Sequence, residues 1–285
     1  MRPEVAAAAE LTRMALTEDV GEADWTSEWT VPEGRTGVAR VLAKSPGIAC
    51  GLHVAEHVFL EVDRELDVGV DGSDGRHLEP GDAVLRVEGS LRSILTAERT
   101  ALNFLARLSG IATLTGRFVE AIAGTGCRVS DTRKTTPGWR WLEKYAVGIG
   151  GGMSHRAGLY DMVLIKENHI RAAGGVQRAI EAALPGARRL GIEVEVEVTN
   201  LDELEEALAA GPDRVMLDNM DPEGLAAGVV RVQGLPEPRP LVEASGGVSL
   251  ETAREIALTG VDYISVGALT HSAPAMDYSL LVSGG

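Results

Sequence analysis

Basic side chains cluster in one stretch of an acidic chain. Of the 285 residues, 27 are Lys or Arg and 42 are Asp or Glu, which gives a net charge of −15. Residues 131–171 nevertheless hold seven Lys or Arg against four Asp or Glu, a local charge of +3. Arg133, Lys134 and Lys166 follow β-forming runs and are therefore predicted at strand ends. Because a concave basic surface concentrates anions, we predict an anionic substrate, with a solvated helix face as the alternative.

Carboxylates follow a strand pattern further along the chain. Glu and Val alternate over residues 193–198, so the three glutamates share one face of a strand. In a barrel these glutamates would face the interior, where each carboxylate needs a partner. Lys166 ends the preceding strand and is the expected partner of Glu195 or Glu197. A structural ion-pair network is the alternative for these glutamates, more so for Glu195 than for Glu197.

A second acidic residue ends the next predicted strand. Asp218 lies near the end of the run DRVMLDN, and Glu197 lies near the end of the strand before it. Two carboxylates on adjacent strand ends suit a hard cation such as Mg²⁺, held partly through water and partly by substrate phosphate oxygens. We therefore predict that Glu197 and Asp218 bind magnesium.

Two short glycine-containing segments follow the last two predicted strands. They are Ser245-Gly246-Gly247 and Val266-Gly267-Ala268. Loops after the last strands of a barrel commonly bind phosphate through exposed backbone N–H groups, and glycine allows the close approach. We predict a phosphate site here, which His271 could also reach; ordinary turns are the alternative.

Other histidines permit a different chemistry. His53-Val54-Ala55-Glu56-His57 matches the HxxEH pattern of inverted zinc proteases. The match is short and the surrounding sequence offers no obvious third ligand, so a solvated helix face is the stronger interpretation. His155 lies in the basic stretch, where ligand contact and structural hydrogen bonding are equally consistent with its position.

Alternating strands and helices must position these residues. The predicted strands are CRVSDTRK, DMVLIKEN, IEVEVEV, DRVMLDN, LVEASGG and VDYISVGAL, with helical stretches such as LDELEEALAA between them. This alternation predicts a parallel sheet, and six or seven such units favour a closed or nearly closed barrel. In such a barrel the active site lies at the carboxyl ends of the strands.

The first hundred residues have a different pattern. An amphipathic helix over residues 1–20 precedes short β-like runs from Arg35 onward, and helical spacing begins again near Ile94. We expect Thr96 to cap this helix, which would place Arg99 in the first turn, where the macrodipole disfavours a cation. That cost hints at a function for Arg99, with a surface ion pair as the alternative. We predict an N-terminal α+β domain over 1–105, on which the tail 272–285 packs, and a barrel over 106–271.

Composition excludes several classes of protein. The net negative charge argues against a nucleic-acid binder. No apolar run is long enough to span a membrane, and the two cysteines, Cys50 and Cys127, form no CxxC pair. We expect a protein of the cytoplasm without nucleic-acid or membrane partners.

The segment from Asp131 to Ile170, DTRKTTPGWRWLEKYAVGIGGGMSHRAGLYDMVLIKENHI, resembles the signature stretch of the quinolinate phosphoribosyltransferases. The similarity extends through LTAERTALNFLARLSGIAT, VMLDN, ASGGV and VGALTHS. It implies an α/β fold with an incomplete, about seven-stranded parallel barrel and a sandwich-like N-terminal domain. It also implies a homodimer with shared active sites, with higher oligomers left open. The implied reaction joins quinolinate to phosphoribosyl pyrophosphate with Mg²⁺, giving nicotinate mononucleotide, pyrophosphate and CO₂.

The resemblance assigns roles to individual residues. Those expected to take part in the chemistry are Lys134, Lys166, Glu197 and Asp218, and Arg99 would reach the site of a partner subunit. Substrate binding is implied for Arg99, Thr132, Arg133, Lys134, His155, Arg156, Lys166, Glu197, Asp218, Ser245, Gly246, Gly247, Val266, Gly267, Ala268 and His271. The sequence departs from the family pattern at Trp139, Ser154 and Glu167, which affects fine geometry rather than the charged ligands.

Three alternative functions remain at this point. A related transferase with another acceptor, such as nicotinate, would keep the phosphate-binding half. A lyase would use Lys166 to form a Schiff base. A zinc hydrolase would use His53 and His57.

Overall fold

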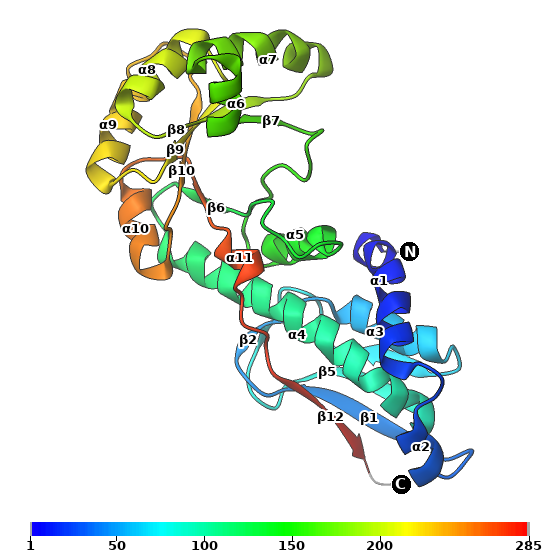
Figure 1. The fold of residues 1–285 in the computed structure, drawn as a ribbon. Helices are drawn as coiled ribbons and strands as arrows, with labels where there is room; N and C mark the ends of the chain where they lie inside the picture. The colour runs from blue at the N-terminus through cyan, green and yellow to red at the C-terminus, as the bar shows by residue number, and fades with distance from the viewer. Residues whose placement is uncertain (1, 284–285) are drawn as a thin grey trace. The chain divides into compact units, whose positions relative to one another are not determined.

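The computed structural model describes residues 2–283 and contains two compact units (Figure 1). The first unit takes in the chain up to Gly116, Thr135–Gly151 and the chain from Leu269 onward. The second takes in Arg117–Lys134 and Gly152–Ala268. Met1 and residues 284–285, which the predicted domain bounds include, lie outside the described residues.

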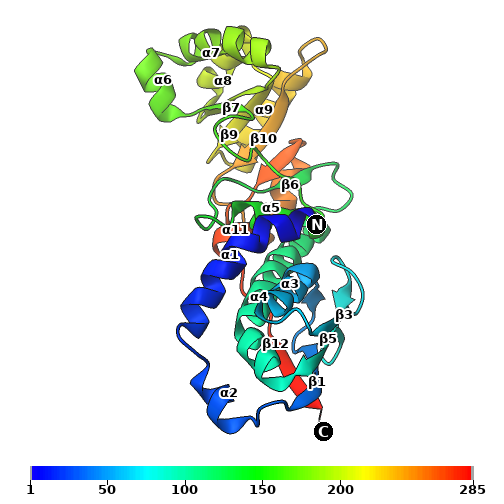
Figure 2. The same cartoon turned by 90° about the vertical axis from the view of Figure 1, so that its right-hand side faces the viewer.

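The first unit is built on an antiparallel sheet with the order β12-β1-β5-β3. Its strands are β1 (Thr36–Ala43), β3 (Asp67–Val70), β5 (Ala83–Ser90) and β12 (Tyr278–Ser283), and β2 (Gly47–Ile48) pairs separately with β4 (His77–Leu78). The helices are α1 (Pro3–Val20), α2 (Trp25–Thr30), α3 (Leu52–Val62), α5 (Arg140–Ile149) and most of α4 (Leu91–Ala121). The end of the chain thus returns to this unit, because β12 pairs with β1 from Val38↔Ser283 to Ala43↔Tyr278 (Figure 2).

The long helix α4 starts earlier than the sequence analysis predicted. It begins at Leu91, directly after β5, and the hydroxyl of Ser90 accepts the Ser93 N–H at 3.3 Å. Thr96 therefore does not cap the helix; its hydroxyl donates to Asp24 Oδ2 at 3.0 Å. Arg99 lies in the third turn, where the macrodipole has little effect. The electrostatic argument for a function of Arg99 is therefore wrong.

The second unit contains the predicted parallel sheet. Its order is β6-β11-β10-β9-β8-β7, and every pairing is parallel. The strands are β6 (Arg128–Ser130), β7 (Val163–Ile165), β8 (Val194–Val198), β9 (Arg214–Asp218), β10 (Leu241–Ser245) and β11 (Tyr263–Ser265). The helices are α6 (Glu167–Ala173), α7 (Val176–Leu190), α8 (Leu201–Ala210), α9 (Pro222–Gln233) and α10 (Leu250–Leu258), and α11 (Ala268–His271) leads back into the first unit.

All six strands named from the sequence are present, and the α/β fold class is confirmed. The barrel is incomplete, because β6 and β7 are the two edges of the sheet. A single parallel bridge from Ser130 to Met153 extends the pairing beyond β6. Among the described residues, this bridge is the only pairing found where a seventh strand would lie.

Local sequence explains where the strand-to-helix turns fall. Asn200 accepts the Glu203 N–H at 2.9 Å and so caps α8, and Asp221 accepts the Gly224 N–H at 2.8 Å at the start of α9. Pro222 occupies the first position of α9, where a missing N–H costs no hydrogen bond. The strands before these caps end at Val198 and Asp218, so Glu197 and Asp218 lie at the same edge of the sheet.

In the part of the chain that the structure describes, no helix combines the length and apolarity needed to cross a membrane.

The closest backbone approach in the first unit lies at Gly110 of α4. A Cβ there would stand 2.1 Å from the carbonyl oxygen of Pro274, in the segment that leads to β12. We predict that Gly110→Ala destabilises the protein by about 1–3 kcal/mol, because backbone must move to accommodate the methyl group. Urea unfolding measures the effect.

Gly186 in α7 provides the matched control, since a Cβ there would meet nothing within 4 Å. Gly186→Ala should leave stability unchanged or raise it by roughly 0.5–1 kcal/mol, as expected for Gly to Ala in a helix. Equal effects of the two substitutions would contradict the close approach at Gly110.

Candidate active site

A cavity of about 580 Å³ opens at the carboxyl ends of the parallel strands. Its lining consists mostly of residues that end strands or directly follow them. These are Thr132, Arg133, Lys134, His155, Arg156, Leu164, Lys166, Glu197, Met216, Asp218, Asn219, Ser245, Gly246, Gly247 and Ser265. The parallel sheet therefore brings together side chains that lie more than a hundred residues apart in the sequence.

The structure places most of the predicted site residues in this cavity. The exceptions are Val266, Gly267 and Ala268, which follow the lining residue Ser265, and Arg99 and His271, which belong to the first unit. Arg99 is exposed on α4, and His271 Nδ1 lies 2.6 Å from the Ser272 hydroxyl. The roles assigned to these five residues and to the residues that line the cavity all stay predictions.

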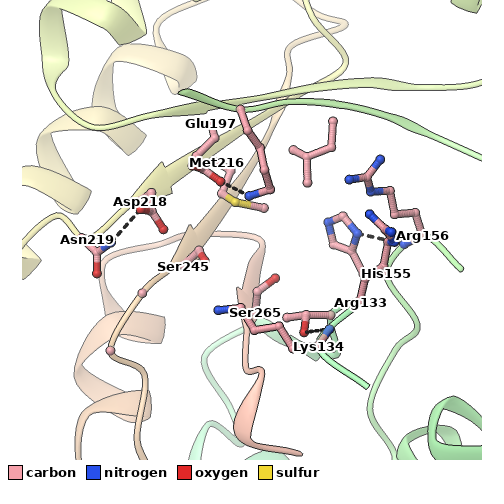
Figure 3. A pocket seen from close by; sticks show the side chains of 15 residues that line it. Arg133, Lys134, His155, Arg156, Glu197, Met216, Asp218, Asn219, Ser245 and Ser265 are labelled. Atoms are coloured by element: carbon pink, nitrogen blue, oxygen red, sulfur yellow. Dashed lines mark hydrogen bonds and ion pairs between the residues drawn. The ribbon is translucent and has the colours of Figure 1, made fainter. Parts of the chain in front are cut away.

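One side of the cavity is cationic. Figure 3 shows Arg133, His155 and Arg156 grouped on one side, with Lys134 below them. Burial lowers the pKa of Arg156, and the neighbouring Arg133 lowers it further. The Nε of Arg133 is buried and has no hydrogen-bond partner among the described residues. Two crowded guanidinium groups with an unused donor favour an anion between them, since Arg binds carboxylates in a planar, bidentate manner.

The opposite side carries a carboxylate and an amide. Asp218 Oδ2 accepts a hydrogen bond of 2.6 Å from Asn219 Nδ2, and Ser245 lies beside this pair (Figure 3). Asn219 has a left-handed backbone, with φ of 54°, and a Cβ on Gly246 would stand 2.2 Å from its Oδ1. Glycine at 246, where φ is 91°, therefore permits a contact between two loops that any side chain would block.

Lys166 forms an ion pair with Glu197, and both residues line the cavity. The sequence left open whether its partner was Glu195 or Glu197, and the structure selects Glu197. The choice follows from the strand register, in which Leu164 of β7 stands opposite Glu195 of β8. Lys166 lies two residues beyond Leu164, and Glu197 lies two residues beyond Glu195, so these two side chains are neighbours on the same face.

Glu195 instead belongs to a buried cluster beneath the cavity. His155 Nε2 lies 3.0 Å from Glu195 Oε2 and 3.5 Å from Glu243 Oε2. Ser265 donates a hydrogen bond to Glu243 Oε1. Burial raises the pKa of Glu195. Burial lowers the pKa of His155, but hydrogen bonds and charges from the two glutamates outweigh it and raise the pKa to about 9.

Glu243 was missed in the sequence analysis, although a signal for it was present. It lies two residues before Ser245 in the run LVEAS, flanked by Val242 and Ala244. The alternation used for residues 193–198 applies here too, and it places Glu243 and Ser245 on the same inward face. The other lining residues that were missed are Leu164, Met216, Asn219 and Ser265.

Two sets of residues could hold a metal ion. The first set lies within residues 2–283 and has three ligand atoms that are all within 4.8 Å of one another. Its members are His155, Glu195 and Glu243. The predicted pair, Glu197 and Asp218, offers two hard oxygen ligands at the cavity itself, which fits a cation that keeps several waters.

Comparison with known proteins identifies the family. The model of the quinolinate phosphoribosyl transferase N-terminal domain matches residues 24–109, and that of the C-terminal domain matches residues 111–281. The chain belongs to the quinolinate phosphoribosyltransferase family. The resemblance drawn from the sequence is thereby confirmed.

Individual members of the family cover nearly the whole chain. The nicotinate-nucleotide pyrophosphorylase [carboxylating] of Mycobacterium leprae is 43% identical over 282 residues, 96% of each chain. The quinolinate phosphoribosyltransferase [decarboxylating] 2, mitochondrial, of Nicotiana glauca is 43% identical over 96% of this chain and 81% of that protein. The solved structure of the nicotinate-nucleotide pyrophosphorylase from Francisella tularensis is 41% identical, with a TM-score of 0.93 over 99% of this chain and 98% of that one.

Positions where the chain departs from the family pattern lie outside the cavity lining. Trp139 stacks on Phe104 with ring centroids 4.7 Å apart, Glu167 pairs with Arg171 on α6, and Ser154 is exposed. His53, of the zinc-protease pattern, pairs with Glu56 at 2.7 Å. Because the chain belongs to this family, a phosphoribosyltransferase is the main interpretation of its function, ahead of a zinc hydrolase or a Schiff-base lyase.

Proposed function

We infer that this chain transfers the phosphoribosyl group of phosphoribosyl pyrophosphate to quinolinate, giving nicotinate mononucleotide, pyrophosphate and CO₂. One observation carries the inference: a single cavity has a cationic side, with Arg133 and Arg156, facing a side with Asp218 and Asn219. A pyridine dicarboxylate suits the first side. A ribose with its hydroxyl groups and a metal-bound diphosphate suits the second.

The chemistry needs no protein nucleophile. Loss of pyrophosphate from C1 of the ribose develops positive charge, which the carboxylates of Glu197 and Asp218 would stabilise. Mg²⁺, when bound by these carboxylates, would neutralise the leaving group. Lys134 and Lys166 would hold phosphate and carboxylate oxygens. Once the ring nitrogen is bonded to C1 it is cationic, and it would stabilise the electron pair left on ring C2 when the C2–carboxylate bond breaks and CO₂ leaves; C2 then takes a proton from water.

Further parts of the proposal rest on the sequence. The backbone N–H groups of 245–247 and 266–268, with His271, would hold a phosphate. The −15 net charge and the unpaired cysteines support a cytoplasmic protein without nucleic-acid or membrane partners. The family resemblance supports a homodimer in which Arg99 completes the partner's site.

An assay with both substrates tests the reaction. Purified protein with quinolinate, phosphoribosyl pyrophosphate and Mg²⁺ should form nicotinate mononucleotide and CO₂ in equal amounts. Nicotinate in place of quinolinate tests the alternative acceptor, and faster turnover of nicotinate would refute the proposal.

We predict that Arg133 sets the requirement for a dicarboxylate. Arg133→Ala removes a charged donor from a buried anion site, which should cost roughly 2–4 kcal/mol. The quinolinate KM should therefore rise, or kcat should fall, by about 30-fold to 10³-fold. Arg171→Ala is the control, because Arg171 lies in the same basic stretch but is exposed on α6 and pairs with Glu167. Wild-type kinetics in Arg133→Ala would remove Arg133 from the site.

We predict that Glu197 and Asp218 make donor binding dependent on magnesium. Glu197→Gln and Asp218→Asn keep the side-chain shape but lose the charge that a hard cation needs. Calorimetry of phosphoribosyl pyrophosphate binding should show a clear gain on adding Mg²⁺ in the wild type and in Glu205→Gln, whose exposed carboxylate pairs with Arg231. Neither site variant should show that gain. An undiminished magnesium effect in both variants would place the metal elsewhere.

We predict that the active site is shared across a two-fold dimer, with Arg99 supplied by the partner. Inactive Arg99→Ala and Lys166→Ala chains, mixed and reassembled, should recover about a quarter of wild-type activity. Half of the dimers are then mixed, and each mixed dimer holds one intact site of two.

Mixing Lys166→Ala with Glu197→Gln is the control. Both residues line the cavity of one chain, so no intact site forms in that mixture. If subunit exchange is verified and the Arg99→Ala mixture also stays inactive, Arg99 acts within its own subunit.

A further inference from the structure

The turn after β9 has a backbone conformation that a residue with a side chain rarely adopts. Asn219, directly after Asp218, has φ of 54°, and every other residue with positive φ in the described part of the chain is a glycine. Left-handed backbone is unfavourable for a residue with a Cβ, although Asn tolerates it better than most. Glycine would adopt the same turn without strain. An asparagine here therefore points to a use for its side chain.

The backbone of Asn219 joins two strand ends. Asp218 and Ser245 are paired and are the last residues of β9 and β10, and the Asn219 N–H donates to the Ser245 carbonyl at 2.9 Å. This hydrogen bond continues the pairing one residue beyond the strands. It holds the start of the segment 245–247 close to Asp218.

The side chain of Asn219 turns back toward the residue before it. In an extended strand, neighbouring side chains point to opposite faces. Asn219 nevertheless lines the same cavity as Asp218, and its Nδ2 donates to Asp218 Oδ2 at 2.6 Å (Figure 3). Because the amide engages Oδ2, the carboxylate is held in one orientation, and Oδ1 is the oxygen left to meet a ligand.

The other end of the amide packs against the glycine-containing segment 245–247. A Cβ on Gly246 would stand 2.2 Å from Asn219 Oδ1 and 2.5 Å from its Cγ, so the backbone of this segment lies directly against the amide. One side chain thus contacts both parts of the cavity that the proposed function assigns to the phosphoribosyl donor. These parts are the carboxylate of Asp218 and the segment 245–247.

We propose that Asn219 is a positioning residue for the phosphoribosyl donor. Its amide orients the Asp218 carboxylate, and its contact with Gly246 sets the distance from that carboxylate to the segment 245–247. The ribose hydroxyl groups and a phosphate group of one donor molecule would then meet both partners at once. The inference rests on the proposed function, from which it takes the identity of the donor.

Two substitutions separate the amide from the backbone. Asn219→Gly keeps the left-handed turn and removes the amide, whereas Asn219→Ala removes the amide and also strains the turn. In Asn219→Gly, calorimetry should show a roughly tenfold rise in the Kd of phosphoribosyl pyrophosphate with Mg²⁺, as expected for the loss of a hydrogen bond to a charged group. Asn219→Ala should weaken donor binding at least as much.

Kinetics and unfolding separate positioning from a general structural role. In Asn219→Gly the KM for phosphoribosyl pyrophosphate should rise with the Kd, while the KM for quinolinate stays unchanged. The Asn219 side chain is exposed, so the urea midpoint should stay close to that of the wild type.

Asn200→Gly is the matched control. Asn200 lies in the turn after β8, where its side chain caps α8, and it is outside the cavity lining. Replacing Asn by Gly at such a cap has a small effect on stability. The KM of neither substrate should change in this variant.

A double-mutant cycle tests the contact with Gly246 in the free protein. Gly246→Ala places a methyl group where the Asn219 amide lies and also strains a backbone with φ of 91°. The strain is common to both backgrounds, but the clash with the amide is absent in Asn219→Gly. Gly246→Ala should therefore lower the urea midpoint less in Asn219→Gly than in the wild type.

Three results would overturn the inference. The first is wild-type donor affinity in Asn219→Gly, which would leave only the backbone of this turn with a role, even if Asn219→Ala is impaired. The second is an equal rise in the KM of both substrates, which would indicate a general disturbance of the cavity. The third is an equal effect of Gly246→Ala in both backgrounds. A wild type that binds no phosphoribosyl pyrophosphate contradicts the proposed function itself, and is recognised before any variant is compared.

Discussion

Glu195 and Glu243 turn their side chains into the interior of the second unit, from two strands separated by β9 in the sheet. A carboxylate in that position is costly unless a polar partner lies beside it, and the partner of both glutamates is the imidazole of His155. This contact has consequences beyond the three side chains. It fixes the imidazole, the imidazole contacts the backbone of Arg156, and Arg156 with Arg133 forms the cationic side of the cavity.

The same backbone stretch is held from a second direction. The N–H of His155 donates to Asp131 Oδ1 at 2.9 Å, and Asp131 is a buried residue directly after β6. The N–H groups of Ala157 and Gly158 donate to Asp161, so the segment after Arg156 is closed by its own turn. The irregular backbone that carries His155 and Arg156 is thus held by the buried carboxylate of Asp131 on one side and by the Asp161 turn on the other.

Much of this protein could be predicted from its sequence. The period-two alternation of Glu and Val, and the alternation of strands with helices, correctly indicated a parallel sheet with polar residues at the carboxyl ends. The position of Arg133, Lys134, Lys166, Glu197 and Asp218 at one cavity followed, since carboxyl ends of parallel strands meet at one edge. The start of α4 was misjudged because Ser90 and Thr96 are both acceptable caps, and only the end of β5 selects Ser90.

The sequence by itself determined the type of fold, the strands and the residues that could carry charge, because hydrophobic period and residue chemistry are local properties. Which charges neutralise one another was decided by the tertiary structure. The sequence allowed Lys166 to pair with either Glu195 or Glu197, and strand register sends it to Glu197. It gave no reason to place Glu243 beside His155, because these residues are 88 positions apart and no periodic pattern links them. That contact exists because parallel strands carry side chains from distant parts of the chain into one interior, where an ionised group has to find its partner.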